Sequence, residues 1–496
     1  MLFGLDLGTS SLKAVLLDPE TGRMVQEKAP LSILQPAAGC AEADPETWWT
    51  ALVQVLARLR DKAPADFAAI EAVGISTIFP ALVPMDAAGR PLRNSLLYCD
   101  LRSVPQVNAL ATRLGLGEFE RRTGNRLTPG TCTLPGICWL RENEPNVFGA
   151  THVFGQATTF LIQRLTGACV LDYTQASLSG MTLSGREDAW DDALLELAGI
   201  GPERLPSLMH SGAVAGTVTQ AAFEACGLRK GVPVVAGAGD APLAALGGGV
   251  VGAHELFCSA GTTDCLLFTG PRAPRNPVFA NCRYALPELW VSIGTMTAGG
   301  GSIKWCCDRL LHCTPGEMTA WAERAAPGSG GVVFLPYLQG ERTPWWDPQA
   351  RAMLFGLTAG TGREEVCRAV FEGVAFGWRQ IVGMLEHEYG FKAAEAICAG
   401  GGTTNRFWNT VKASVLGIPV RTLRMPETAS LGAALIGGLG AGIFKTPEAA
   451  RAATEPLRSS DVALPVPGWI ETCQENYQTY VNAYPATRDL LPAHGE

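Results

Sequence analysis

The sequence has little charge and no excess of positive charge. Of its 496 residues 17% are charged, and 47 Asp and Glu outnumber 39 Lys and Arg. Broad nucleic-acid binding needs a basic surface, so this composition argues against a nucleic-acid partner. The fifteen cysteines form no CxxC pair and the six histidines are scattered, which excludes the spacing of a zinc site. We expect free thiols in a reducing compartment.

Long apolar segments are missing as well. The longest uncharged apolar stretch, residues 428–444, is rich in glycine and falls short of the about 20 residues that span a bilayer. The first residues have no basic region, and Asp6 lies among them, which argues against a secretory signal. Hydrophobic residues make up 47% of the chain, enough for a sizeable core. We expect a soluble, cytoplasmic protein of two or three domains with no membrane partner.

Two similar segments lie about half a chain apart. Residues 3–18 form two apolar runs around a small polar turn, Gly8–Ser11, and residues 255–268 repeat this order around Gly261–Thr263. Each segment predicts a β-hairpin. The repeat predicts two domains of similar design that face each other, with a boundary in the Gly/Ala-rich stretch 241–253.

Other elements follow from periodicity and capping. Asp44, as N-cap before Pro45, predicts the start of an amphipathic helix. Its buried face is expected to consist of Trp48, Trp49, Leu52, Val55, Leu56 and Leu59. Strands are predicted at 70–76, 80–85, 94–99, 232–236, 289–293 and 395–399, and helices at about 363–389 and from Asn405 to Leu416.

The turns suit phosphate binding. Nucleotide phosphates need unobstructed backbone N–H groups, hydroxyl donors and a cation, and Gly8–Ser11 with Lys13 supplies all three. Asp6 is placed to hold Mg²⁺ through water. The turn at 261–263 is placed to clamp the same phosphates. A single Gly-Thr turn is more often structural, but two matched turns and the glycine run 400–402 favour binding.

Two positions keep alternative interpretations. Asp240 follows a buried strand and Gly237–Gly239, so it either faces a cleft as a general base for an alcohol that attacks a γ-phosphate, or caps the segment 241–247. The run 400–402 is either a tight strand-to-helix turn or a place where a flat base or ribose approaches the backbone.

Taken together, these motifs resemble the FGGY carbohydrate kinases and, among them, are most similar to the xylulokinases. The resemblance covers nearly the whole chain. It is carried by Asp6–Lys13 (DLGTSSLK), Tyr98–Arg102 (YCDLR), Gly237–Asp240 (GAGD), Ser259–Thr263 (SAGTT), Phe334–Pro344 (FLPYLQGERTP) and Gly400–Trp408 (GGGTTNRFW).

The resemblance implies an α/β protein with two actin-like (ribonuclease-H-like) domains around a central cleft. Residues 1–245 would form the N-terminal domain with the sugar side and the catalytic Asp, and residues 246–496 the nucleotide-binding C-terminal domain. The implied reaction is ATP-dependent phosphorylation of a sugar or polyol hydroxyl, with Mg²⁺ as cofactor. Related kinases are often dimers, which makes a homodimer an expectation although no interface can be read.

Roles carry over residue by residue. Asp240 matches the catalytic base and Asp6 the catalytic carboxylate near Mg²⁺, and both are expected to hold the metal through water. The expected ATP-binding residues are Gly8, Thr9, Ser10, Lys13, Thr262, Thr263, Gly300, Gly401, Gly402 and Asn405. The expected substrate-binding residues are Ile78, Phe79, Asp100, Arg102 and Asp240.

The departures from the family lie on the sugar side. Ile78–Ala81 stands where xylulokinases have Gln-Met-His-Gly, Ala241 and Pro242 follow the catalytic Asp in place of Asn or Gln, and Thr158–Thr159 replaces a Lys-Asp pair. Each change removes a hydrogen-bond partner for a polyol, so the acceptor is expected to differ from D-xylulose.

Two other classes stay open. These changes would also suit a non-catalytic sugar- or nucleotide-sensing protein with an inherited kinase cleft. An actin- or Hsp70-like ATPase with an assembly role is the third reading. Retention of both Asp6 and Asp240, and the sugar-kinase motifs at 98–102 and 334–344, favour the kinase.

Overall fold

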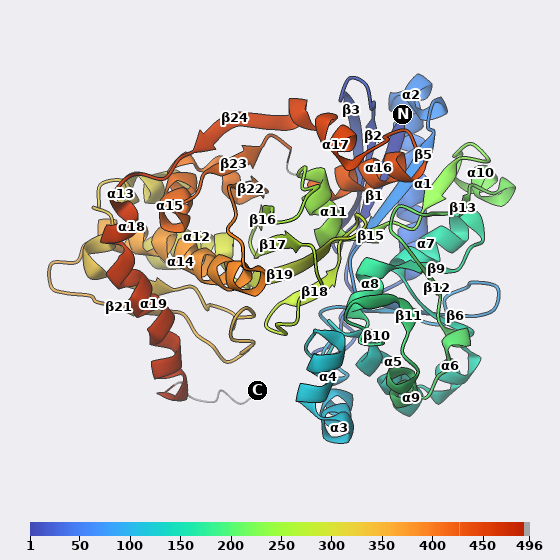
Figure 1. Cartoon of the computed structure of the whole chain (residues 1–496), viewed down its shortest axis with the longest axis horizontal. Coiled ribbons are helices and arrows are strands. Elements are labelled where there is room, and N and C mark those ends of the chain that lie inside the picture. Colours follow the sequence, from blue (N-terminus) through green and yellow to red (C-terminus); the bar gives the residue numbers. More distant parts are fainter. Residues whose placement is uncertain (426, 491–496) are drawn as a thin grey trace. The chain divides into compact units, whose positions relative to one another are not determined.

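The computed structural model describes residues 1–425 and 427–490, and the chain forms two compact units (Figure 1). Unit 1 consists of Met1–Ala253, Thr269–Val291 and Glu427–Pro456. Unit 2 consists of the described residues within 254–268, 292–426 and 457–496. The boundary expected at 245/246 assigns Thr269–Val291 and Glu427–Pro456 to the C-terminal domain, whereas by contacts both segments belong to unit 1.

Unit 1 is built on a mixed sheet in the order β13-β14-β5-β1-β2-β3, with β15 also paired to β5. Strands β1 and β2 form the predicted first hairpin, and β5 runs parallel to β1. The strands are β1 (Leu2–Leu7), β2 (Ser11–Leu17), β3 (Met24–Pro30), β5 (Ala72–Thr77), β13 (Val214–Thr217), β14 (Pro233–Val235) and β15 (Ala238–Gly239).

Helices cover this sheet. The predicted first helix is present: the Asp44 carboxylate accepts the Glu46 N–H at 2.9 Å, and the expected apolar face is buried except for the half-buried Trp49. The helices that pack around the sheet are α1 (Pro45–Lys62), α2 (Pro64–Ala68), α7 (Ala157–Thr166), α8 (Tyr173–Leu178), α10 (Gln220–Cys226), α11 (Asp240–Gly247), α16 (Thr428–Gly440) and α17 (Pro447–Ala452).

Glycines bring α16 against the sheet and against α11 (Figure 1). A Cβ atom on Gly74 of β5 would lie 1.8 Å from the Ala433 carbonyl oxygen, and one on Gly432 would lie 1.8 Å from that of Leu243. This is the apolar stretch noted at 428–444. None of the helices in the described ranges has the length and apolar character that a bilayer span requires.

The rest of unit 1 contains a second core around a small sheet in the order β4-β7-β6-β8. Its strands are β4 (Glu42–Ala43), β6 (Ala81–Met85), β7 (Ser95–Leu97) and β8 (Val153–Gln156). Further elements are α3 (Val104–Leu114), α4 (Leu116–Thr123), α5 (Thr133–Asn143), α6 (Pro145–Ala150), α9 (Asp192–Ala198), β9 (Val170–Asp172), β10 (Thr182–Leu183), β11 (Arg186–Trp190), β12 (Ser207–Met209) and β18 (Ala280–Arg283).

Unit 2 repeats the arrangement of unit 1. Its strands run in the order β19-β17-β16-β22-β23-β24, β16 and β17 form the second predicted hairpin, and β22 runs parallel to β16 as β5 does to β1. The strands are β16 (Leu256–Ala260), β17 (Asp264–Gly270), β19 (Trp290–Met296), β20 (Val333–Leu335), β21 (Met353–Phe355), β22 (Ala396–Ala399), β23 (Val420–Leu423) and β24 (Arg458–Ala463). The helices are α12 (Gly299–Trp305), α13 (Pro315–Ala322), α14 (Arg363–Tyr389), α15 (Arg406–Leu416), α18 (Trp469–Thr472) and α19 (Gln474–Thr487). All fifteen cysteines are free thiols, as expected.

Candidate active site

The first predicted phosphate loop joins β1 to β2. The Gly8 N–H donates to the Ser11 carbonyl oxygen at 3.0 Å, which closes the turn and leaves Ser10 exposed. Lys13 lies opposite Asp6 in the strand register, and its Nζ is 2.5 Å from Oε2 of Glu427, the residue before α16. The cation of the loop is therefore paired with a carboxylate of the same unit.

Asp6 is a buried carboxylate at the end of β1. Its Oδ1 accepts a hydrogen bond from the Ser76 hydroxyl on the neighbouring strand at 2.8 Å. Burial raises its pKa to about 6, a rise that the Ser76 hydrogen bond and the Lys13 charge reduce. A carboxylate in this state is unstable as a lone charge and is stabilised by a cation.

Asp240 is held beside β5 by a glycine turn. Gly237 has a φ of +72°, and a Cβ there would lie 2.1 Å from the Ile75 carbonyl oxygen, so only glycine suits the position. The turn leads into β15, whose Gly239 is in register with Thr77, and Asp240 is the first residue of α11.

The two carboxylates influence each other. Burial, followed by the negative charge of Asp6, raises the pKa of Asp240 to about 7. The Ala241 N–H, which donates to Oδ1 of Asp240 at 2.8 Å, acts in the opposite direction and lowers this pKa. The structure thus brings Asp240 near Asp6 and Lys13, which lie more than 220 residues earlier in the sequence. Two carboxylates that titrate near neutral pH suit proton transfer and suit Mg²⁺, which takes few protein oxygens and keeps waters.

The described residues contain no cluster of three or more His, Cys, Asp or Glu side chains suited to a metal. The donor set of Asp6 and Asp240 fits a Mg²⁺ ion, because the charge repulsion that raises the pKa of Asp240 would be relieved by a divalent cation.

The second predicted phosphate loop, in unit 2, is joined to the start of α12. The Gly300 N–H donates to the Gly261 carbonyl at 2.9 Å, and the Gly301 N–H to the Thr262 carbonyl at 3.0 Å. The Thr263 hydroxyl donates to the carbonyl of Thr297 at 3.1 Å. The Gly300 N–H is therefore engaged within the protein, and its glycine is needed because a Cβ would lie 2.5 Å from the Gly261 oxygen.

Two buried acids that the sequence reasoning missed support this loop. Asp264 accepts the Gly261 N–H at 3.1 Å and the Trp378 indole N–H at 2.8 Å, and burial raises its pKa while the Lys412 charge lowers it. Glu341 accepts the N–H of Thr297, the residue whose carbonyl receives the Thr263 hydroxyl, at 2.7 Å. Asp264 follows the loop directly, so its position was a usable signal. Glu341 lies 77 residues after Asp264, within the motif Phe334–Pro344, to which no role was assigned.

The glycine run before α15 contains the tight strand-to-helix turn that was one of the two roles considered for it. Gly400 has a φ of +102° and its missing Cβ would lie 2.4 Å from the Ala260 carbonyl oxygen, so it is a structural turn beside the second loop. Gly401 has nothing within 4 Å of its missing Cβ, which leaves open space over the backbone. Asn405 caps α15 by accepting the Trp408 N–H at 3.0 Å, and its Nδ2 donates to Thr319.

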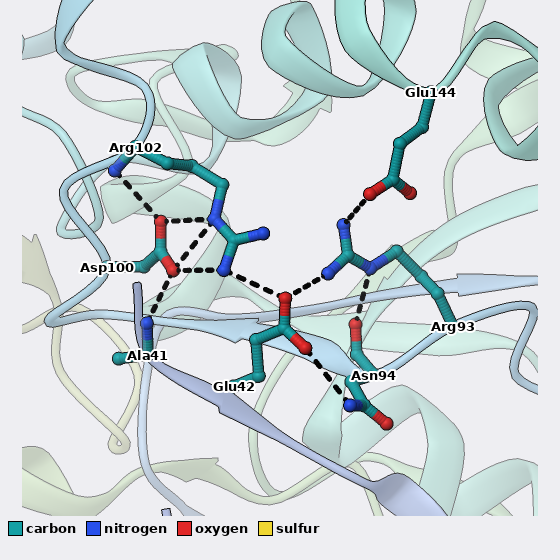
Figure 2. Close-up of polar contacts among 7 residues, drawn as sticks. All are labelled: Ala41, Glu42, Arg93, Asn94, Asp100, Arg102 and Glu144. Atoms are coloured by element: carbon teal, nitrogen blue, oxygen red, sulfur yellow. Dashed lines mark hydrogen bonds and ion pairs between the residues drawn. The ribbon is translucent and has the colours of Figure 1, made fainter. Parts of the chain in front are cut away.

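Asp100 and Arg102 belong to a network of ion pairs in unit 1 (Figure 2). Asp100 Oδ2 accepts the Ala41 N–H at 2.6 Å, and Arg102 donates to both Asp100 oxygens and approaches Glu42 at 2.8 Å. The remaining members are Arg93, Asn94 and Glu144. These contacts give Asp100 and Arg102 a structural function, and no motif in the sequence pointed to Glu42 or Arg93.

The altered segment after β5 offers few hydrogen-bond donors. The Ile78 N–H donates to the Leu7 carbonyl at 2.8 Å, the Ala81 N–H donates to Gln156 Oε1 at 2.8 Å, and Pro80 has no N–H. Ile78 is buried and Phe79 half-buried.

Thr158, one of the two threonines at the position where the resemblance leads one to expect a Lys-Asp pair, belongs to an uncharged cluster. The Thr158 hydroxyl hydrogen-bonds with that of Thr77 at 2.7 Å and with the Gln175 amide, and all three side chains are fully buried. Thr77 is the register partner of Gly239. The cluster therefore fills the region beside Gly239 with neutral groups.

Comparison with known proteins identifies the class to which this fold and site belong. Residues 1–247 match the N-terminal domain model, and residues 256–441 the C-terminal domain model, of the FGGY family of carbohydrate kinases. The chain therefore belongs to this family.

The relatives agree on kinase chemistry and differ in acceptor. The chain is 30% identical to a xylulose kinase of Escherichia coli (strain K12) over 84% of this chain and 85% of that protein. It is 28% identical to glycerol kinase 2 of Thermotoga maritima, with coverage of 90% and 91%. The crystal structure of a xylulose kinase from Rhodospirillum rubrum matches with a TM-score of 0.92 at 27% identity over 99% of both chains.

The chain is therefore a kinase that uses ATP to phosphorylate a hydroxyl of a sugar or polyol. The expected α/β fold of two actin-like domains is confirmed. No finding supports the sensing protein or the assembly ATPase.

Proposed function

We propose that Asp240 is the general base of this kinase. The observation that carries the proposal is its pKa of about 7, raised by burial and by the neighbouring charge of Asp6. A base with a pKa near the working pH combines a large ionised fraction with a strong pull on a proton. The Asp240 carboxylate accepts the proton of the acceptor hydroxyl as that oxygen bonds to the γ-phosphorus, and the bond from phosphorus to the bridging oxygen breaks to release ADP.

Asp6 and Lys13 are proposed to balance the charges of Mg²⁺ and of the phosphates in the same site. Asp6 and Asp240 would hold Mg²⁺ through water, and the ion supplies positive charge to the transferring phosphoryl group when bound. Lys13 is proposed to exchange its partner Glu427 for phosphate oxygens, with Thr9 and Ser10 presenting their amide and hydroxyl groups. Since the Gly8 N–H donates to Ser11, Gly8 is proposed to act by shaping this loop.

Unit 2 is proposed to hold the nucleotide. Thr262, Thr263 and Asn405 would supply polar contacts, and the open space over Gly401 would admit a flat group to the backbone next to Gly402. Since the Gly300 N–H donates to Gly261, Gly300 is proposed to act by shaping the loop and not as a donor to phosphate.

The acceptor is proposed to carry fewer hydroxyls than D-xylulose where it faces Ile78–Ala81. The backbone N–H groups of Ile78 and Ala81 are engaged and Pro80 has none, so a hydroxyl there would lose its water partners without gaining these donors. Asp100 and Arg102 are proposed to support the acceptor side mainly through the network of Figure 2.

ADP release with Mg·ATP and a panel of ketoses, aldoses, polyols and deoxy sugars tests the base. We expect an acceptor-dependent signal in the wild type that Asp240→Asn abolishes. Asp191→Asn is the matched control, because Asp191 is a largely buried carboxylate of unit 1 that caps α9, and it should keep the signal. Turnover by Asp240→Asn near that of the control would refute the assignment.

The same panel tests the acceptor class by comparing D-xylulose with its monodeoxy analogues. We expect at least one deoxy analogue to exceed D-xylulose in kcat/KM by roughly tenfold, about 1.4 kcal/mol of differential transition-state binding. A preference for D-xylulose over every analogue would contradict the proposed apolar contact while leaving the role of Asp240 untouched. The cytoplasmic location and the homodimer stay predictions from the sequence.

A further inference from the structure

The hydroxyl group of Thr174 lies between a buried acid and the residue before Asp240. Thr174 is 1% exposed and follows β9 at the start of α8. Its Oγ1 donates to Asp172 Oδ1 at 2.5 Å and accepts the Gly239 N–H at 3.0 Å. Since Gly239 directly precedes Asp240, this hydrogen bond reaches the backbone that carries the proposed base.

Gly239 is buried, and the Thr174 hydroxyl is its nearest packing neighbour. The nearest heavy atom to a Cβ built on it would be 3.7 Å away, and that atom is Thr174 Oγ1 itself. Its strand, β15, consists of two residues paired with Ser76 and Thr77. The hydrogen bond from the Gly239 N–H to Thr174, together with this short pairing, constrains where α11 begins and so where the Asp240 carboxylate lies.

Asp172 fixes which way the Thr174 hydroxyl points. Asp172 Oδ1 also accepts the backbone N–H groups of Thr174 at 2.9 Å and Gln175 at 3.1 Å, so the carboxylate is held as the N-cap of α8. A hydroxyl has one proton, and donating it to Asp172 leaves the oxygen lone pairs to receive the Gly239 N–H.

We propose that Thr174, oriented by Asp172, is a positioning residue for the catalytic base. The proposal rests on the proposed function of Asp240. Removing the hydroxyl leaves the buried Gly239 N–H without its acceptor, and the start of α11 shifts to find another. A displacement of about 1 Å at a reacting group costs on the order of 10²-fold in rate. We expect this loss in the rate of the chemical step and not in the binding of either substrate.

Four variants of the full-length protein test this. Thr174→Val removes the hydroxyl at nearly constant shape, Thr174→Cys replaces it by a weaker acceptor, and Thr174→Ser retains it. Thr182→Val is the matched control, because Thr182 is equally buried and its hydroxyl donates to the Ala176 carbonyl of the same helix at 3.1 Å. The measurements are kcat and the KM values for ATP and for the best acceptor of the panel.

We expect Thr174→Val to lower kcat by roughly 10- to 100-fold while both KM values stay within about twofold. kcat should decrease from Thr174→Ser to Thr174→Cys to Thr174→Val. The Ser variant should be within about threefold of the wild type, and Thr182→Val should be close to the wild type. If Thr174→Val does not fold, the comparison of Ser with Cys decides. Equal kcat in those two, a change confined to KM, or an equal loss in Thr182→Val would overturn the proposal.

Measuring Asp240→Asn alongside these variants distinguishes failure of the base assignment from failure of the positioning proposal. Normal turnover of Asp240→Asn would overturn the base assignment and the positioning proposal together. An inactive Asp240→Asn combined with a fully active Thr174→Val would overturn only the positioning proposal.

Discussion

Replacing Asp240 by Asn should remove activity and stabilise the folded protein at the same time. The amide cannot accept the hydroxyl proton, and loss of general-base catalysis costs roughly 10²- to 10⁴-fold in kcat. In the wild type, kcat/KM should fall as the pH drops below about 7, because the pKa of Asp240 in the free enzyme is raised to about 7 and its protonated form is inactive.

The stability change follows from the same pKa. It rises from 3.8 in the unfolded chain to about 7 in the folded protein, so the folded state binds this proton more tightly. Below about pH 4, Asp240 is protonated in both the folded and the unfolded protein and does not reduce the free energy of unfolding. As the pH rises from about 4 to about 7, this free energy progressively decreases. At about 1.4 kcal/mol per pKa unit the upper limit is about 4 kcal/mol. Asp240 keeps some contact with solvent, and the resulting screening reduces our expectation to roughly 1–3 kcal/mol.

Urea unfolding of wild type and Asp240→Asn at pH 4.5, 6 and 8 measures this difference. We expect Asp240→Asn to be more stable by roughly 1–3 kcal/mol at pH 8, with the gain shrinking toward zero at the lowest pH. Asp191→Asn should instead lose stability at pH 8, since it breaks an ion pair with Arg122. A gain independent of pH, or a loss at pH 8, would refute the picture of a buried, repelled carboxylate.

Two further substitutions test the supporting structure. Gly74→Ala should lower the free energy of unfolding in urea by about 1–3 kcal/mol or more, because its Cβ would lie 1.8 Å from the Ala433 carbonyl oxygen of α16. The control Gly383→Ala, which has open space on α14, should leave this free energy unchanged or raise it. Equal effects of the two substitutions would contradict the close packing of α16. Asp264→Ala should weaken ATP binding in calorimetry by roughly tenfold, because it leaves the buried Gly261 N–H unpaired; unchanged affinity would show that this support is unnecessary.

Local patterns in the sequence were sufficient for the repeated elements. Apolar runs around small turns gave both hairpins, and Asp44 before Pro45 gave the start of α1. These features depend on residues near each other in the chain, where capping and side-chain alternation act directly. The motif resemblance supplied the family, which the comparisons confirm.

Only the tertiary structure decided what surrounds the candidate catalytic residues. The mutual effect of Asp6 and Asp240, the pairing of Lys13 with Glu427, and the contact of Thr174 with Gly239 join segments far apart in sequence. A pKa depends on burial and neighbouring charge, and the partner of a buried N–H depends on which strand or helix folds against it. The sequence therefore determined which groups could carry out the chemistry, and the packing of unit 1 determined their charge and their position.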